Sequence, residues 1–87
     1  MAEHPPIELS RHALEQCALR GETAAEIRLA IEYGVREPAR LGRWMYRYNP
    51  AYDDHWQGTK YAIKQVAPIV AEEPDRLVVI AVYPFFF

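Results

Sequence analysis

The chain has 87 residues, of which 51% are hydrophobic and 25% are charged, and these proportions are ordinary for a globular domain. The composition excludes intrinsic disorder and a coiled coil, and the length fits a single domain. Ten Lys and Arg against twelve Asp and Glu leave a formal net charge of −2, which gives no overall positive field to attract nucleic acid or a membrane. A chain this short buries only about two-thirds of its unfolded surface, so we expect a small stability or help from a partner.

Basic residues are concentrated in the middle of the chain. Residues 36–64 hold six Arg and Lys against three acidic residues, whereas the first 35 residues hold six acidic residues and three arginines. Eight of the ten basic residues are arginine, whose planar guanidinium suits bidentate contact with phosphate. A genome rich in G and C would give the same excess of arginine without any function.

Two short helices are predicted within residues 7–34. Ser10 is a suitable N-cap for the first helix, and Gly21 stands where a C-cap glycine belongs. Thr23 and Glu26 have the spacing of a capping box, which marks the start of the second helix. With two or three residues between them, the two helices should form an αα-hairpin.

Three strands are predicted in the second half of the chain. Residues 43–48 are aromatic-rich, residues 60–70 alternate in part, and residues 77–83 are apolar on both faces, as expected of a central strand. The polar residues 49–59 should form a loop.

We therefore expect an α+β fold in one domain, residues 1–87, with the αα-hairpin packed on one face of a small antiparallel sheet of about three strands. Residues 1–6 would be a loose arm, residues 7–34 the helical hairpin, and residues 42–87 the sheet. The tail Phe85–Phe87 should either fold back onto the sheet or form a homo-oligomer contact, because an exposed cluster of this kind favours aggregation.

No metal or cofactor motif is present. The chain has neither CxxC nor HExxH nor a glycine-rich phosphate loop, and Asp53–His55 lacks a second group of ligands, so we expect no metal and no cofactor. Cys17 is the only cysteine and falls on the apolar side of the first helix, which favours a core position and a reducing, cytoplasmic location. No signal peptide is recognised, and the apolar run 77–87 is too short to span a bilayer.

His12 and Arg20 are the first candidates for chemistry. A metal-free ribonuclease needs a base, an acid and cations for the phosphorane charge, and His, Arg, Lys and Tyr can fill these roles. Alternatively, His12 caps its helix locally, and Arg20 is favoured by the helix dipole alone. The aromatic residues between 44 and 61 alternate with Arg43, Arg47 and Lys60, a pattern that makes either a stacking surface for bases or part of a small core.

Two segments resemble a known family. Residues 10–31, SRHALEQCALRGETAAEIRLAI, and residues 60–86, KYAIKQVAPIVAEEPDRLVVIAVYPFF, look like the opening and the close of small bacterial proteins of the domain of unknown function 4258 family. The marks are His12, the pair Arg20-Gly21 and the pair Tyr83-Pro84. That family is distantly similar to the RelE/ParE-like toxins, which cleave mRNA without metal in their RelE-type members and are neutralised by a small antitoxin.

The resemblance implies a toxin-like, metal-independent domain that cleaves or binds RNA, with RNA or the ribosome and a small antitoxin as partners. It implies His12, Arg20 and Tyr83 as catalytic residues. The basic residues of the sheet would bind substrate: Arg43, Arg47, Lys60 and Lys64. The alternative is a non-catalytic interaction module that forms a homo-oligomer through its C-terminal aromatic segment, with no membrane partner in either case.

Overall fold

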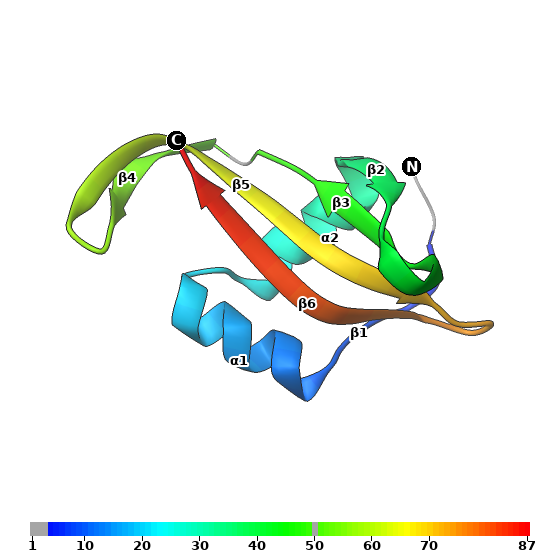
Figure 1. The fold of residues 1–87 in the computed structure, drawn as a ribbon. Coiled ribbons are helices and arrows are strands. Elements are labelled where there is room, and N and C mark those ends of the chain that lie inside the picture. The colour runs from blue at the N-terminus through cyan, green and yellow to red at the C-terminus, as the bar shows by residue number, and fades with distance from the viewer. Residues whose placement is uncertain (1–3, 50) are drawn as a thin grey trace.

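The computed structural model describes residues 4–49 and 51–87, without the side chains of residues 51–54 and 56. Within this part of the chain, two helices pack on one face of a five-stranded mixed sheet (Figure 1). The elements in chain order are β1 (Ile7–Leu9), α1 (Arg11–Arg20), α2 (Ala24–Tyr33), β2 (Val35–Pro38), a 3₁₀ turn (Arg40–Gly42), β3 (Trp44–Arg47), β4 (Ala51–Trp56), β5 (Thr59–Glu72) and β6 (Leu77–Phe86).

The strands of the sheet follow the order β1-β6-β5-β3-β2 among the described residues, and β4 pairs with β5 outside this order. β1 is parallel to β6, with Ile7 opposite Leu77, and the other pairs are antiparallel. The long strands β5 and β6 form the centre of the sheet, and β4 and the start of β5 extend as a hairpin arm at one end (Figure 1).

The prediction of an antiparallel sheet of about three strands is wrong. The segments missed are Ile7–Leu9 and Val35–Pro38, expected in the helical hairpin and in a connector, and Ala51–Trp56, expected in a loop. Each is too short or too polar to show a strand period, and each becomes a strand by pairing with residues elsewhere in the chain. Of the predicted arm, residues 1–3 lie outside the described residues.

The predicted helix ends are confirmed. The Ala13 N–H donates to Ser10 Oγ at 3.1 Å, and Gly21 has a φ of 72°, the left-handed conformation that glycine adopts without strain. The Thr23–Glu26 capping box is complete in both directions. These contacts are local in sequence, which is why the sequence was sufficient to predict them.

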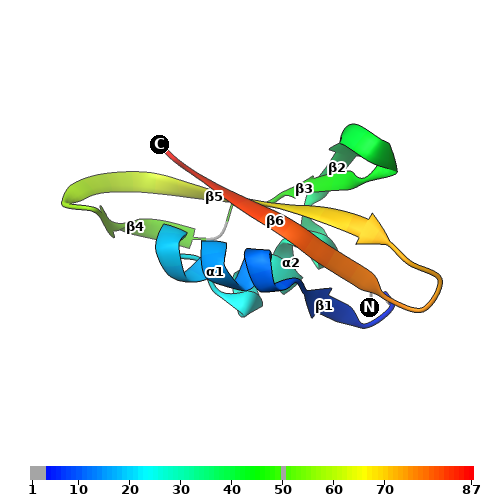
Figure 2. The ribbon, with the colours of Figure 1, turned by 60° about the horizontal axis from the view of Figure 1, so that its bottom comes forward.

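The core lies between the helices and one face of the sheet. Ile27 and Ala30 of α2 and Ala13 of α1 are fully buried with Val66 of β5 and Val82 of β6. Figure 2 shows both helices on the same side of β5 and β6. The other side of the sheet therefore has no helix layer, and we call it the open face.

The outer edge of β6 is protected by α1. β1 pairs only with the start of β6, so the backbone at Val82 would otherwise lack a partner. The Val82 N–H donates to Gln16 Oε1 at 2.7 Å, and Arg20 Nη1 donates to the Val82 carbonyl at 3.0 Å. Pro84, two residues further along this edge, has no N–H to leave unpaired. These features protect the edge at Val82 and Pro84 against pairing with another chain.

The C-terminal tail joins the sheet. Phe85 and Phe86 belong to β6, and the Phe87 N–H donates to the Ile63 carbonyl at 2.8 Å. The Tyr61 and Phe86 rings lie 5.3 Å apart between centroids. Of the two expectations for the tail, folding onto the sheet is thus realised within one chain.

None of the described helices is long and apolar enough to cross a membrane.

Candidate functional site

The open face carries exposed aromatic side chains along β6. Side chains alternate along a strand, so Tyr83 and Phe85 point away from the helices that Val82 packs against. Tyr83 is 40% exposed and Phe85 is 39% exposed. On the neighbouring strand β5, Ile63 is 45% exposed. Large apolar groups that face solvent on a sheet without a covering layer indicate a binding surface.

An arginine lies close to each of the two rings. The Arg47 guanidinium is 5.7 Å from the Phe85 ring centroid, and Arg47 also donates to Glu37 Oε1 and to Gln65 Oε1, both at 2.9 Å. Arg20 reaches around the β6 edge from α1 and lies 5.2 Å from the Tyr83 ring centroid. Each ring thus lies beside a guanidinium group, and the charge of the one beside Phe85 is balanced by Glu37.

A hollow of about 430 Å³ lies beneath the turn that joins β2 to β3. This turn is at the end of the sheet away from the hairpin arm (Figure 1). Most of its lining residues are apolar, and Tyr83 is one of them, so the hollow adjoins the exposed aromatic residues of β6. Arg40, Arg43 and Glu37 supply its charges. Glu37 is paired with Arg47, whereas Arg40 and Arg43 form no ion pair with a described side chain. The other lining residues are Pro38, Ala39, Met45, Ile69, Ile80 and Ala81.

The structure brings four of the predicted site residues to the open face or its edge: Arg20, Tyr83, Arg43 and Arg47. It does not bring His12 to them. His12 is exposed in the first turn of α1, and its distance from Arg20 along the helix axis is about 12 Å, because eight residues separate them. Lys60 is exposed near the start of β5, in the hairpin arm.

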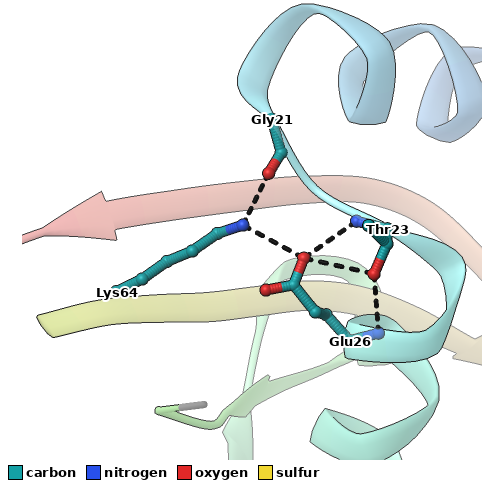
Figure 3. A network of polar contacts seen from close by, with 4 residues as sticks. All are labelled: Gly21, Thr23, Glu26 and Lys64. Carbon is teal, nitrogen blue, oxygen red and sulfur yellow. Dashed lines mark hydrogen bonds and ion pairs between the residues drawn. The ribbon is translucent and has the colours of Figure 1, made fainter. Parts of the chain in front are cut away.

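Lys64 lies on the opposite side of the sheet, buried beneath the helical hairpin. Only 3% of the residue is exposed, and its Nζ donates to the Gly21 carbonyl and to Glu26 Oε1 (Figure 3). The same Glu26 oxygen accepts from the Thr23 N–H at 3.0 Å. Lys64 therefore joins β5 to the link between α1 and α2, and it does not reach the open face.

Three other aromatic candidates also face away from the open face, whereas the side chains of Tyr52 and Trp56 lie outside the described residues. Tyr46 is buried in the core, and Trp44 and Tyr48 pack against it. The Arg36 guanidinium stacks 4.0 Å from the Trp44 ring centroid. The side chains of Asp53 and Asp54, considered above as metal ligands, lie outside the described residues. The stacking surface is therefore formed by Tyr83 and Phe85, whose place on the face follows from the strand alternation of β6.

Glu22 is a buried carboxylate that the sequence did not indicate. The residue is 6% exposed, and neither side-chain oxygen has a hydrogen-bond partner. Burial raises the pKa of Glu22 to about 7; the nearby Glu26 carboxylate adds to this increase, and Lys64 and Arg20 oppose it. The pKa of Cys17 is also raised, by burial first and then by the two carboxylates.

The arginines and the apolar and aromatic side chains of the open face suit an anionic ligand that also has planar apolar parts. Its hollow holds one carboxylate, Glu37, and one phenol, Tyr83, as the groups able to transfer a proton. Among the side chains that the structure describes, no three of His, Cys, Asp and Glu are grouped to hold a metal ion. Arg40, which contributes to the hollow, was not a sequence candidate, although it shares the spacing Arg-Leu-Gly-Arg with Arg43.

Comparison with protein-family models, with curated proteins and with solved structures found no match to this chain. The resemblance to the domain of unknown function 4258 family stays a prediction.

Proposed function

We propose that this protein binds single-stranded RNA on the open face of the sheet. The observation that carries the proposal is the placement of Tyr83 and Phe85 two residues apart on β6, both exposed and each beside an arginine. Successive bases of a single strand stack on aromatic side chains, and positively charged groups beside them attract the phosphates. Gln65, which lies opposite Phe85 on β5, helps to hold Arg47 beside that ring, since its Oε1 accepts from Arg47 and its Nε2 donates to Asn49 Oδ1.

The distribution of charge supports this use of the open face despite the net charge of −2. Arg40 and Arg43 lie on it and form no ion pair with a described side chain, whereas Arg47 and Glu37 balance each other's charge at 2.9 Å. Several acidic residues belong to the helices and to the link between them: Glu15, Glu22, Glu26 and Glu32. A local positive surface on an acidic protein is sufficient for contact with the nucleic acid backbone.

Cleavage of RNA remains a separate prediction. His12, its expected acid or base, lies in the helix layer, and the groups beside the Tyr83 ring are those of Arg20 and of the hollow. RNA binding by itself needs none of these to transfer a proton.

Replacing Tyr83 or Phe85 with alanine is expected to weaken RNA binding by about tenfold each, since the loss of one stacked base costs about 1–3 kcal/mol. The measurement is fluorescence anisotropy with a labelled 12-nucleotide RNA at low salt, followed by a salt titration. The matched control is Tyr33→Ala, which removes a 65% exposed tyrosine from the end of α2. RNA binding that is absent in the unaltered protein, or equally weakened in Tyr33→Ala, would contradict the proposal.

A second candidate function is self-association through the same aromatic segment. Phe87 is 63% exposed and continues the row of Tyr83 and Phe85, next to Ile63. We expect that a homo-oligomer, if formed here, dissociates when Phe85 and Phe87 are both replaced by serine. Light scattering over a range of concentrations measures this, and a protein that is strictly monomeric at the highest concentration would exclude self-association.

A further inference from the structure

We propose that the hollow beneath the β2–β3 turn binds a single 5′-mononucleotide unit, with the phosphate on Arg40 and Arg43 and the base against Tyr83. The inference rests on the proposed RNA binding. It states that one nucleotide of the bound RNA would occupy the hollow. A volume of about 430 Å³ falls within the range of small-ligand sites, which are mostly apolar and have a few placed polar groups.

The first observation is that two of the residues lining the hollow are arginines that could bind a phosphate. Arg40 and Arg43 form no ion pair with a described side chain, and the one carboxylate in the lining, Glu37, accepts from Arg47 at 2.9 Å. Guanidinium groups form strong bidentate hydrogen bonds to phosphate oxygens. Two such groups at one side of the hollow therefore supply a place for a phosphate monoester or diester.

The second observation is that the remaining lining residues are mostly apolar and could contact a base. Met45, Ile69, Ile80 and Ala81 come from three neighbouring strands and give a surface without hydrogen-bonding side chains, and Tyr83 adds one aromatic face with a hydroxyl. A purine or pyrimidine has a planar, largely apolar face that stacks on such a surface. A phosphate alone would leave the floor exposed to water, and a base alone would leave both arginines without a partner.

The backbone of the turn keeps the two arginines at the rim. The Ala39 N–H donates to the Arg43 carbonyl at 2.8 Å and closes the turn. Leu41 has a φ of 61° and Gly42 a φ of 72°, so two consecutive residues are left-handed. This costs Leu41 about 1–2 kcal/mol, and its side chain is 84% exposed, so burial does not offset that cost. The turn thus has a constrained backbone, and Arg40 and Arg43 flank its two left-handed residues.

The test measures binding of 5′-AMP, adenosine and inorganic phosphate to the full chain by calorimetry and by amide chemical shifts. We expect 5′-AMP to bind at least tenfold more tightly than adenosine or phosphate, with the largest shifts at Met45, Ala81 and Tyr83. Arg40→Ala and Arg43→Ala should each weaken 5′-AMP binding at least fivefold. Arg28→Ala, which removes an exposed arginine from α2, is the matched control.

The possible results distinguish failure of the nucleotide site from failure of the proposed RNA binding. Equal affinity for 5′-AMP and phosphate, or shifts that spread over the surface, would overturn the nucleotide site, as would full affinity in both arginine variants. If RNA still binds through Tyr83 and Phe85 while 5′-AMP does not bind, the hollow is excluded and the proposed function stands. If neither RNA nor 5′-AMP binds, both proposals fail. Unchanged melting temperatures of the two arginine variants show that a loss of affinity is local.

Discussion

Replacing Lys64 with methionine is expected to lower the free energy of unfolding by about 3–5 kcal/mol, the cost of leaving buried charges without their partner. The ammonium of Lys64 lies near Glu22, Glu26 and the Gly21 carbonyl, in a place largely shielded from water. Without it, the carboxylates of Glu22 and Glu26 stay close together at the link between the helices. Methionine keeps most of the volume, so the loss reports on charge and hydrogen bonds rather than on a cavity.

Urea unfolding followed by circular dichroism measures this effect. The matched control is Lys60→Met on the same strand, which is exposed and should change stability by less than about 0.5 kcal/mol. Adding Glu22→Gln to Lys64→Met should restore at least about 1 kcal/mol, because contacting charges couple in a double-mutant cycle. Equal stability of the Lys64 and Lys60 variants would show that the buried network contributes nothing to folding.

The stability of the unaltered protein is expected to fall as pH rises through about 7, because of Glu22. The folded state raises the pKa of this carboxyl from 4.5 to about 7, so the folded protein binds a proton that the unfolded chain has already released. The resulting stabilisation is complete below about pH 4.5 and is lost between that pH and about 7. A pKa shift from 4.5 to about 7 corresponds to about 3 kcal/mol between pH 4 and pH 8.5.

Glu22→Gln isolates this contribution, since glutamine has the same shape and does not titrate. The difference in unfolding free energy between the variant and the unaltered protein should grow in favour of the variant as pH rises from 5 to 8.5. The charged groups around this site, Lys64, Glu26 and Arg20, remain in both proteins and cancel in the difference. Two stability curves that stay parallel over this range would show that Glu22 does not titrate near neutral pH.

Local signals in the sequence were sufficient for the helical hairpin. Ser10, Gly21, Thr23 and Glu26 act on backbone groups three or four residues away, so their roles do not depend on the rest of the fold. The run 77–83, which is apolar on both faces, likewise predicted a central strand, and β6 lies between β1 and β5. The edge strands could not be predicted in this way, because Val35–Pro38 becomes a strand only through its pairing with β3.

The candidate site shows the same difference between features set by neighbouring residues and features set by contacts between distant segments. The sequence pointed to arginines in the middle of the chain, and the resemblance implied Tyr83 as a catalytic residue, but neither placed Tyr83 and Phe85 together on an uncovered face. Lys64 has the same charge as Lys60 and a similar place in the strand pattern, yet the two ammonium groups have opposite environments, since the helical hairpin covers one of them. The contact of Arg20 with Tyr83 spans more than sixty residues of chain, and no local pattern reports such a contact.

Composition, capping residues and strand alternation therefore established a small α+β domain with a helical hairpin and arginine-rich strands, because these properties depend on neighbours in the chain. Which face of the sheet remained uncovered, which cation was buried and which carboxylate was left without a partner depended on how the hairpin packed. Burial and electrostatic environment are properties of contacts between distant segments, and Glu22 and Lys64 acquire theirs only when α1, α2 and β5 come together.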